Sequence, residues 1–126
     1  QLASCTLEGT TWYWPADENP RSRRHAPDEQ VRLLAPFDPV VWDRRRFELL
    51  WDWVYKFEAY TPAPKRQYGY YALPVLWHDQ VVGWANLSMR EGELVSNVGY
   101  AGKSLARDKV FRGALDDELQ RMAEFL

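Results

Sequence analysis

The spacing of apolar residues just after position 43 is typical of a helix. Four of them recur at intervals of three and four residues, which predicts one buried stripe: Phe47, Leu50, Trp51 and Val54. The other side of the predicted helix carries charged residues: Arg44, Arg45, Glu48 and Asp52. Asp43 precedes the stretch in the N-cap position, where its carboxylate can accept backbone N–H groups of the first turn.

Other stretches before and after this helix have the composition or period of strands. Residues 10–14 are polar and then aromatic, and Pro15 ends them. Residues 31–35 form a short apolar run that ends at a proline-rich turn. Residues 55–60 alternate between two faces, so a further strand is expected there.

The second half of the chain predicts an antiparallel meander. Its three strands are expected at residues 68–77, 80–89 and 93–100, with hairpin turns between them. Pro74 indicates an edge position or a bulge, and Gly83 allows a close approach of neighbouring groups. Strict alternation assigns five residues of the middle strand to the core face: Val81, Gly83, Ala85, Leu87 and Met89.

A closing helix is expected from about Ser104, as its N-cap, to Phe125, and it should cover one face of the sheet. Its apolar stripe would be Phe111, Leu115, Leu119, Met122 and Leu126. The chain is therefore predicted to be an α+β protein: a small twisted antiparallel sheet, a meander, packed with two helices. Residues 1–30 would form an N-terminal strand and a mobile loop, and residues 31–126 a single α+β domain.

Composition narrows the class of protein. A chain of 126 residues that is 46% hydrophobic is long enough for one domain with a core, and a net charge of −2 requires any nucleic-acid contact to come from local patches. The single cysteine excludes an internal disulfide, and neither histidine has ligand-spaced neighbours, so no metal is expected. No phosphate loop indicates a cofactor, and no apolar run or leader indicates a membrane, so a cytoplasmic location is predicted.

The triplet Arg44, Arg45 and Arg46 opens the predicted helix, where the positive end of the helix dipole disfavours cations. One interpretation is contact with the phosphates of an anionic partner. The alternative is that Arg44 and Arg45 are solvated while Arg46 pairs with a nearby carboxylate, such as that of Asp38 or Asp43. Both interpretations remain open at the level of the sequence.

A second basic stretch follows a proline turn and adds aromatic rings to its cations: Lys65, Arg66, Tyr68 and Tyr70. Cations with flat rings suit phosphate contact and stacking on bases or sugars, although alternating tyrosines are also ordinary in a half-buried strand. For Tyr71 a core position is expected.

Three acids of the last helix, Asp116, Asp117 and Glu118, are expected on a solvated surface. Five tryptophans are assigned to core or interdomain packing: Trp42, Trp51, Trp53, Trp77 and Trp84.

Two blocks, LLAPFDPVVWDRRRFELLW and TPAPKRQYGYY, resemble the C-terminal part of the YcaQ/AlkZ-like family of winged-helix proteins, some of which are DNA glycosylases. The resemblance covers about residues 31–89. It implies a C-terminal fragment of a longer protein, with upstream winged-helix domains and double-stranded DNA as partners. The first block supplies these matching residues: Pro36, Phe37, Asp38, Pro39, Trp42, Asp43, Arg44, Arg45 and Arg46. The second supplies these: Pro62, Pro64, Lys65, Arg66, Gly69, Tyr70 and Tyr71.

The resemblance does not extend to catalysis. In the glycosylase members it implies a glutamine–apolar–glutamine or glutamine–apolar–aspartate motif, and no glutamine of this chain is followed two positions later by either residue. No catalytic residue is predicted, and the chain alone is expected to be inactive. The hypothesis is a DNA-binding, supporting module of a DNA-repair protein. The alternative is a structural or protein–protein interaction domain without DNA binding.

Overall fold

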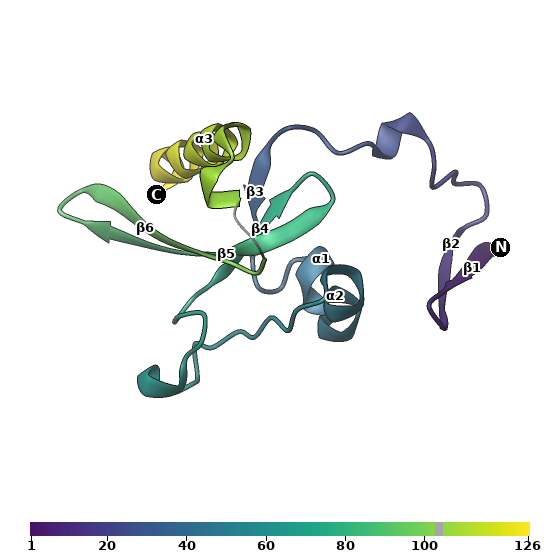
Figure 1. Cartoon of the computed structure of the whole chain (residues 1–126), viewed down its shortest axis with the longest axis horizontal. Helices are drawn as coiled ribbons and strands as arrows, with labels where there is room; N and C mark the ends of the chain where they lie inside the picture. The colour runs from purple at the N-terminus through teal and green to yellow at the C-terminus, as the bar shows by residue number, and fades with distance from the viewer. Residues whose placement is uncertain (103–104) are drawn as a thin grey trace.

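The computed structural model describes residues 1–102 and 105–126 and has an α+β architecture (Figure 1). Within these residues two antiparallel sheets, of two and four strands, are accompanied by three α-helices. The strands are β1 (Leu2–Leu7), β2 (Thr10–Pro15), β3 (Val31–Leu33), β4 (Leu73–Trp77), β5 (Gln80–Arg90) and β6 (Glu93–Tyr100). The helices are α1 (Pro39–Trp42), α2 (Arg44–Trp51) and α3 (Lys109–Phe125), with short 3-10 turns η1 (Arg23–His25), η2 (Ala63–Lys65) and η3 (Leu105–Arg107). No described helix is long and apolar enough to span a membrane.

The first thirty residues contain a hairpin rather than the single predicted strand. β1 pairs with β2 in antiparallel register, and both residues of the connecting turn, Glu8 and Gly9, have positive φ values. Figure 1 shows this hairpin set apart from the four-stranded sheet, at the end of a long connection. β1 has no clean alternation of buried and polar positions because nearly all of it is exposed, which explains why the sequence pattern did not predict it.

The four-stranded sheet has the order β3-β4-β5-β6, which confirms the predicted meander. Its register shifts between Val75 and Leu76: Val75 pairs with Gly83 and Leu76 with Val81, so Val82 is the extra residue of a bulge. The bulge lies near Pro74 of β4, but its extra residue is on β5. It also breaks the strict alternation expected along the middle strand, because one additional residue exchanges the two faces.

The bulge divides the predicted core face of β5 between two hydrophobic clusters. Val81 packs on one side of the sheet, whereas Ala85 and Leu87 pack on the other, and Met89 is exposed. The side of Ala85 is covered by α3, through the buried Phe111 and Leu115. This confirms the predicted position of the closing helix over the sheet.

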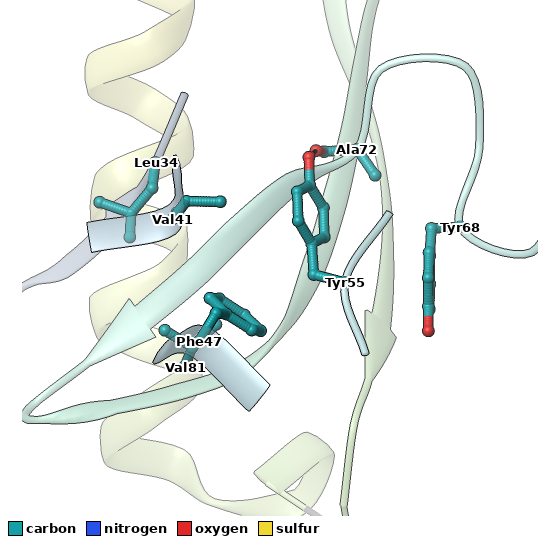
Figure 2. Packing of buried hydrophobic residues seen from close by; sticks show 7 residues of the cluster. All are labelled: Leu34, Val41, Phe47, Tyr55, Tyr68, Ala72 and Val81. Carbon is teal, nitrogen blue, oxygen red and sulfur yellow. Dashed lines mark hydrogen bonds between the residues drawn. The ribbon is translucent and has the colours of Figure 1, made fainter. Parts of the chain in front are cut away.

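The opposite side of the sheet is covered by α1, α2 and the segment that follows them. Figure 2 shows this cluster, in which Phe47 lies close to Val81 and the hydroxyl of Tyr55 reaches the carbonyl of Ala72. Its buried members come from separate stretches of the chain: Leu34, Val41, Phe47, Tyr55, Tyr68, Ala72 and Val81. The sheet is therefore a central layer with apolar packing on both faces.

The helix termini follow capping chemistry. Asp43 caps α2 by accepting the N–H of Arg46, as predicted, and Asp38 caps the unpredicted α1 through the N–H of Val40. α3 begins at Lys109, later than expected, because the Asp108 carboxylate accepts the N–H of Phe111. The predicted cap Ser104 lies outside the described residues.

Two predictions around α2 are wrong. The helix ends at Trp51, and its C-cap Asp52 has a left-handed φ of 55°, so Val54 lies beyond it, and Val54 and Leu50 are about half exposed. Phe47 alone of the predicted stripe is fully buried, with Trp51 packed beside it. Residues 55–60 form no strand; they are irregular, and the burial of both Tyr55 and Glu58 departs from the predicted alternation.

The contact between Gly83 and β6 generates a stability prediction. A methyl group on Gly83 would collide with the backbone carbonyl of Gly99, whereas nothing lies near a methyl group on Gly113 of α3. We expect Gly83→Ala to lower the free energy of unfolding by about 1–3 kcal/mol through overpacking. Gly113→Ala should raise it by about 0.5–1 kcal/mol because alanine is the better helix former. Urea unfolding of both variants tests the pair, and equal effects of the two would contradict the close packing of β5 on β6.

Candidate nucleic-acid interface

A buried carboxylate organises the loop that carries the second basic stretch. Glu58 is only 4% exposed, and its side chain accepts the backbone N–H groups of three successive residues. The donor–acceptor distances are 2.9 Å for Gln67, 2.7 Å for Tyr68 and 3.2 Å for Gly69. Thr61 adds a backbone hydrogen bond to the carbonyl of Glu58 at 3.0 Å. The chain from 58 to 69 is therefore closed into a loop around one acid.

The charge of Glu58 is maintained by these donors. Burial raises the pKa of the carboxyl, but the N–H groups of Gln67, Tyr68 and Gly69 lower it more, and Lys56 acts in the same direction. The net effect is a pKa below the ordinary glutamate value. Glu58 is consequently ionised at neutral pH, and its hydrogen bonds are of the stronger, charge-assisted kind.

The closed loop presents three of the predicted site residues to solvent. Lys65 is exposed at the end of η2, and Tyr70 is 61% exposed. Arg66 donates from Nε to the carbonyl of Thr61 at 2.8 Å, and its guanidinium carbon lies 5.1 Å from the centre of the Tyr70 ring. Arg66 and Tyr70 thus support each other at the surface through a cation–π contact.

The tyrosines of this loop differ from the expected arrangement. Tyr68 is 8% exposed, its hydroxyl donates to the carbonyl of Val54 at 2.6 Å, and its ring packs against Trp84. The predicted core position of Tyr71 is wrong, since this side chain is 45% exposed and packs edge-on against Phe57. Gly69, with a φ of 123°, turns the chain between them, so the residues do not follow the alternation of a strand.

The arginine triplet divides between the interior and the surface. Arg44 donates to the carbonyls of Pro36 and Val41 at 3.1 and 2.6 Å, and its guanidinium carbon lies 4.6 Å from the centre of the Tyr55 ring. Burial lowers the pKa of Arg44 and raises the pKa of Tyr55 to about 12.

The other two arginines have different surroundings. Arg46 donates to the carbonyl of Pro39 and forms no ion pair with Asp38 or Asp43 among the described residues, so the pairing considered from the sequence is wrong. Both of those carboxylates serve as helix caps instead. Arg45 is exposed and makes no side-chain hydrogen bond within the described part of the chain.

The basic residues therefore form two separate surfaces. One is Arg45 on α2, and the other is the loop with Lys65, Arg66 and Tyr70. Figure 1 shows the teal turn of η2 well away from α2, joined to it by the extended chain that follows the helix. We call the four residues Arg45, Lys65, Arg66 and Tyr70 the basic rim.

Two side chains of structural importance were not predicted. Glu58 anchors the loop, and Asn86 of β5 donates to the carbonyl of Tyr68 at 2.7 Å, which joins the loop to the sheet. Their signal in the sequence is weak, because one polar residue in an apolar context does not reveal its partner.

Two further predictions about single residues differ from the structure. Glu118 was placed on a solvated surface, yet it accepts the N–H of Leu33 at 3.0 Å and is largely buried. Trp42 is 70% exposed, so it is not a core residue, and its interdomain packing stays a prediction.

The two histidines lie beside carboxylates. His25 Nε2 is 3.4 Å from a carboxylate oxygen of Glu18, and His78 Nε2 is 3.8 Å from one of Glu29. In the part of the chain that the structure describes, no three histidine, cysteine, aspartate or glutamate side chains are grouped as a metal site requires. The groups that make up the candidate interface are therefore cations and aromatic rings.

Together these features define an α+β domain that carries a rigid loop of basic and aromatic residues. The chain belongs to the AlkZ-like DNA glycosylase family, whose model, described as DNA glycosylase AlkZ-like, matches residues 1–125. The match extends on both sides of the blocks that carry the resemblance in the sequence. No solved structure matches the chain. Family membership relates the chain to DNA-repair glycosylases and implies DNA as a partner.

The hydrogen bonds of Glu58 predict that the stability of the folded chain depends on pH. Because folding lowers its pKa, the unfolded state binds more protons, so this contribution is complete above the ordinary glutamate pKa and is lost as pH falls through the folded value. Glu58→Gln removes the charge and turns an amide N–H group towards the backbone donors. We expect it to cost about 2–4 kcal/mol at pH 7 and to weaken the loss of stability in acid.

Chemical unfolding at several pH values measures both effects. Glu48→Gln provides the control, because Glu48 is an exposed acid on α2, and surface changes of this kind usually alter stability by less than about 0.5 kcal/mol. Equal stability of the two variants at pH 7 would contradict an anchoring role for Glu58.

Proposed function

We propose that this chain is the C-terminal DNA-binding and supporting module of a winged-helix DNA-repair protein, and that it contacts the duplex backbone through the basic rim. The observation that carries the proposal is the rigid loop in which Glu58 accepts three successive N–H groups while Lys65 and Tyr70 face solvent. A loop held in this way loses little conformational entropy when it contacts a phosphate chain. Family membership supports DNA as the ligand.

The position of Arg45 supports an anionic partner on the second surface. The first turn of α2 holds three cations and no acid, although the helix dipole would favour acids there. Arg44 and Arg46 are occupied by carbonyl groups of the chain, which explains two of the three arginines without a ligand. Arg45 has no comparable internal role among the described residues, and a DNA phosphate would supply the missing negative charge.

The remaining predicted site residues have a supporting role in this proposal. Tyr68 is buried beneath the loop, and Arg44 joins the start of α2 to Tyr55, so both position the rim without contacting DNA themselves. The module would brace winged-helix domains of the same chain, and the protein would act inside the cell, where DNA lies. No residue is assigned to catalysis.

A salt-dependence measurement tests the rim. In the complete protein, Arg45→Glu and Lys65→Glu should each weaken binding to a DNA duplex and flatten the plot of log affinity against log salt concentration. Each lost phosphate contact should change that slope by about 1. Fluorescence anisotropy with a labelled duplex at several salt concentrations measures both quantities.

Arg112→Glu is the matched control. It makes the same change of charge at an exposed position of α3, which packs on the other face of the sheet from α1 and α2. Its slope should equal that of the unmodified protein. If Arg45→Glu and Lys65→Glu also leave the slope unchanged, the rim does not contact phosphates.

A second candidate function, a structural or protein-interaction domain, is favoured by an exposed apolar surface near α1 and α2. Phe37, Trp42, Leu49 and Leu50 are each about half exposed or more. Side chains of this size at the surface of a domain are typical of contact with another protein surface. Such contact would involve neighbouring domains or a second copy, and it would not require DNA.

Sedimentation analysis distinguishes this candidate. If the apolar surface mediates self-association, the mass of the chain should rise with protein concentration. Trp42→Gln should then shift the dissociation constant upwards by about tenfold or more, since a central tryptophan of an interface typically contributes about 2 kcal/mol or more. Tyr13→Gln, an equally exposed aromatic position on the hairpin, should leave it unchanged. A monomeric mass at all concentrations would exclude self-association.

A further inference from the structure

A groove runs between the loop and the β5–β6 ribbon, beside the basic rim, with which it shares Tyr70. One wall consists of loop residues from Tyr68 to Tyr71, and the other of polar and apolar residues from the two strands. Its volume is about 540 Å³. The strand residues are Asn86, Leu87, Ser88, Arg90, Val95 and Asn97. We call it the tyrosine groove, and its size falls in the range of pockets for small organic ligands, about 300–1,000 Å³.

The loop wall of the groove is fixed to the sheet. Asn86 donates to the carbonyl of Tyr68, and a side chain at Gly69 would collide with the amide group of Asn86. The glycine therefore allows the loop to approach β5 closely enough for this bond. Glu58 holds the same residues from the other side, through the N–H groups of Tyr68 and Gly69. The groove is consequently preorganised.

The groove combines ring surfaces with amide and hydroxyl groups. Of the three tyrosines that line the groove, Tyr70 and Tyr71 are the more exposed, and the guanidinium of Arg66 lies over the ring of Tyr70. Asn97 lies opposite Asn86 in the β5–β6 register, and the neighbouring Ser88 is exposed. Asn97 carries both a donor and an acceptor, which can bond to the edge of a planar heterocycle.

The charged residues are distributed unevenly along the groove. Arg66 lies over the ring of Tyr70, which lines the loop wall, and Lys65 precedes it in the chain, so this side of the groove offers cations to a phosphate. At the far end Arg90 is followed by Glu91 and pairs in register with Glu93, so acids offset its charge near the hairpin tip. A ligand with one planar heterocycle and an attached phosphate therefore fits with the heterocycle in the groove and the phosphate towards Lys65.

The geometry points to a binding site for an unpaired nucleotide in the tyrosine groove. Its base stacks on Tyr70 or Tyr71, Asn97 and Ser88 bond to the base edge, and Lys65 and Arg66 contact the phosphate. This inference rests on the proposed function for its ligand, but it adds recognition of single-stranded bases to contact with the duplex backbone. Stacking of bases on aromatic side chains accepts any sequence, because every base has a flat face.

Two labelled oligomers separate base binding from phosphate binding. One is a single strand of ten thymidines, and the other has the same phosphate backbone with abasic residues throughout. The 126-residue chain should bind the thymidine oligomer about 5- to 100-fold more tightly in fluorescence anisotropy, as expected for stacking of a base on an aromatic ring. Equal affinity for the two oligomers, or no binding of either, overturns the inference.

Variants locate the effect in the groove. Tyr71→Leu keeps an apolar side chain against Phe57 but removes the ring, and Asn97→Ala changes only an exposed amide. Each should weaken thymidine binding, by about fivefold or more for the ring and about two- to tenfold for the amide, without changing abasic binding. Tyr13→Leu on the hairpin should change neither. If the base preference persists in both groove variants, the bases bind elsewhere.

The same chain with a DNA duplex distinguishes this inference from the proposed function. Retained duplex binding with a salt slope that depends on Lys65, but no base preference, overturns the groove alone. A base preference that depends on Tyr71, with a duplex salt slope insensitive to Arg45 and Lys65, supports the groove and overturns the rim.

Discussion

The candidate interface depends on the burial of one negative charge at Glu58. Moving a carboxylate out of water is costly unless hydrogen bonds replace its hydration, and here three successive backbone N–H groups do so. Those groups would otherwise require partners of their own, because the loop around them is not part of a helix or sheet. The acid and the loop therefore satisfy each other. The exposed positions of Lys65 and Tyr70 follow from this arrangement, as does the approach of Gly69 to Asn86.

The aromatic cluster transmits this constraint to the sheet. The ring of Tyr68 packs against Trp53 and Trp84, at centroid distances of 5.7 and 4.7 Å, and Trp53 also packs against Phe47 of α2. Figure 2 shows the rings of Tyr55 and Tyr68 beside each other in this layer. Hydrogen bonds from Trp53 to the carbonyl of Val81 and from Tyr55 to that of Ala72 fix the ring orientations. The loop, α2 and β5 consequently form one packed unit, so the two parts of the rim belong to a common scaffold.

The sequence was informative where local chemistry decides the structure. The meander was predicted because short alternating runs and turn residues determine hairpins locally, and the cap at Asp43 depends only on its position before the helix. Predictions failed where the environment of a residue depends on a partner that is distant in the sequence. Glu58 and Gln67 are nine positions apart, and nothing local indicates that the acid is buried. Tyr71 was assigned to the core because the turn at Gly69 is invisible to an alternating pattern, and one extra residue at Val82 exchanged the faces of β5.

The arginine triplet shows why charge counts alone could not define the interface. All three arginines share one turn, but successive side chains of a helix point about 100° apart, so they enter different surroundings. Arg44 satisfies two carbonyl groups and a ring, which a planar guanidinium with several donors can do and a lysine ammonium cannot match in geometry. Arg46 reaches the carbonyl of Pro39, and Arg45 remains at the surface. With a net charge of −2, attraction to DNA must arise from local groups of exposed cations, such as those of the basic rim. Under the proposed function, affinity would then be modest and sensitive to salt, because other domains of the same protein would share the contact with DNA.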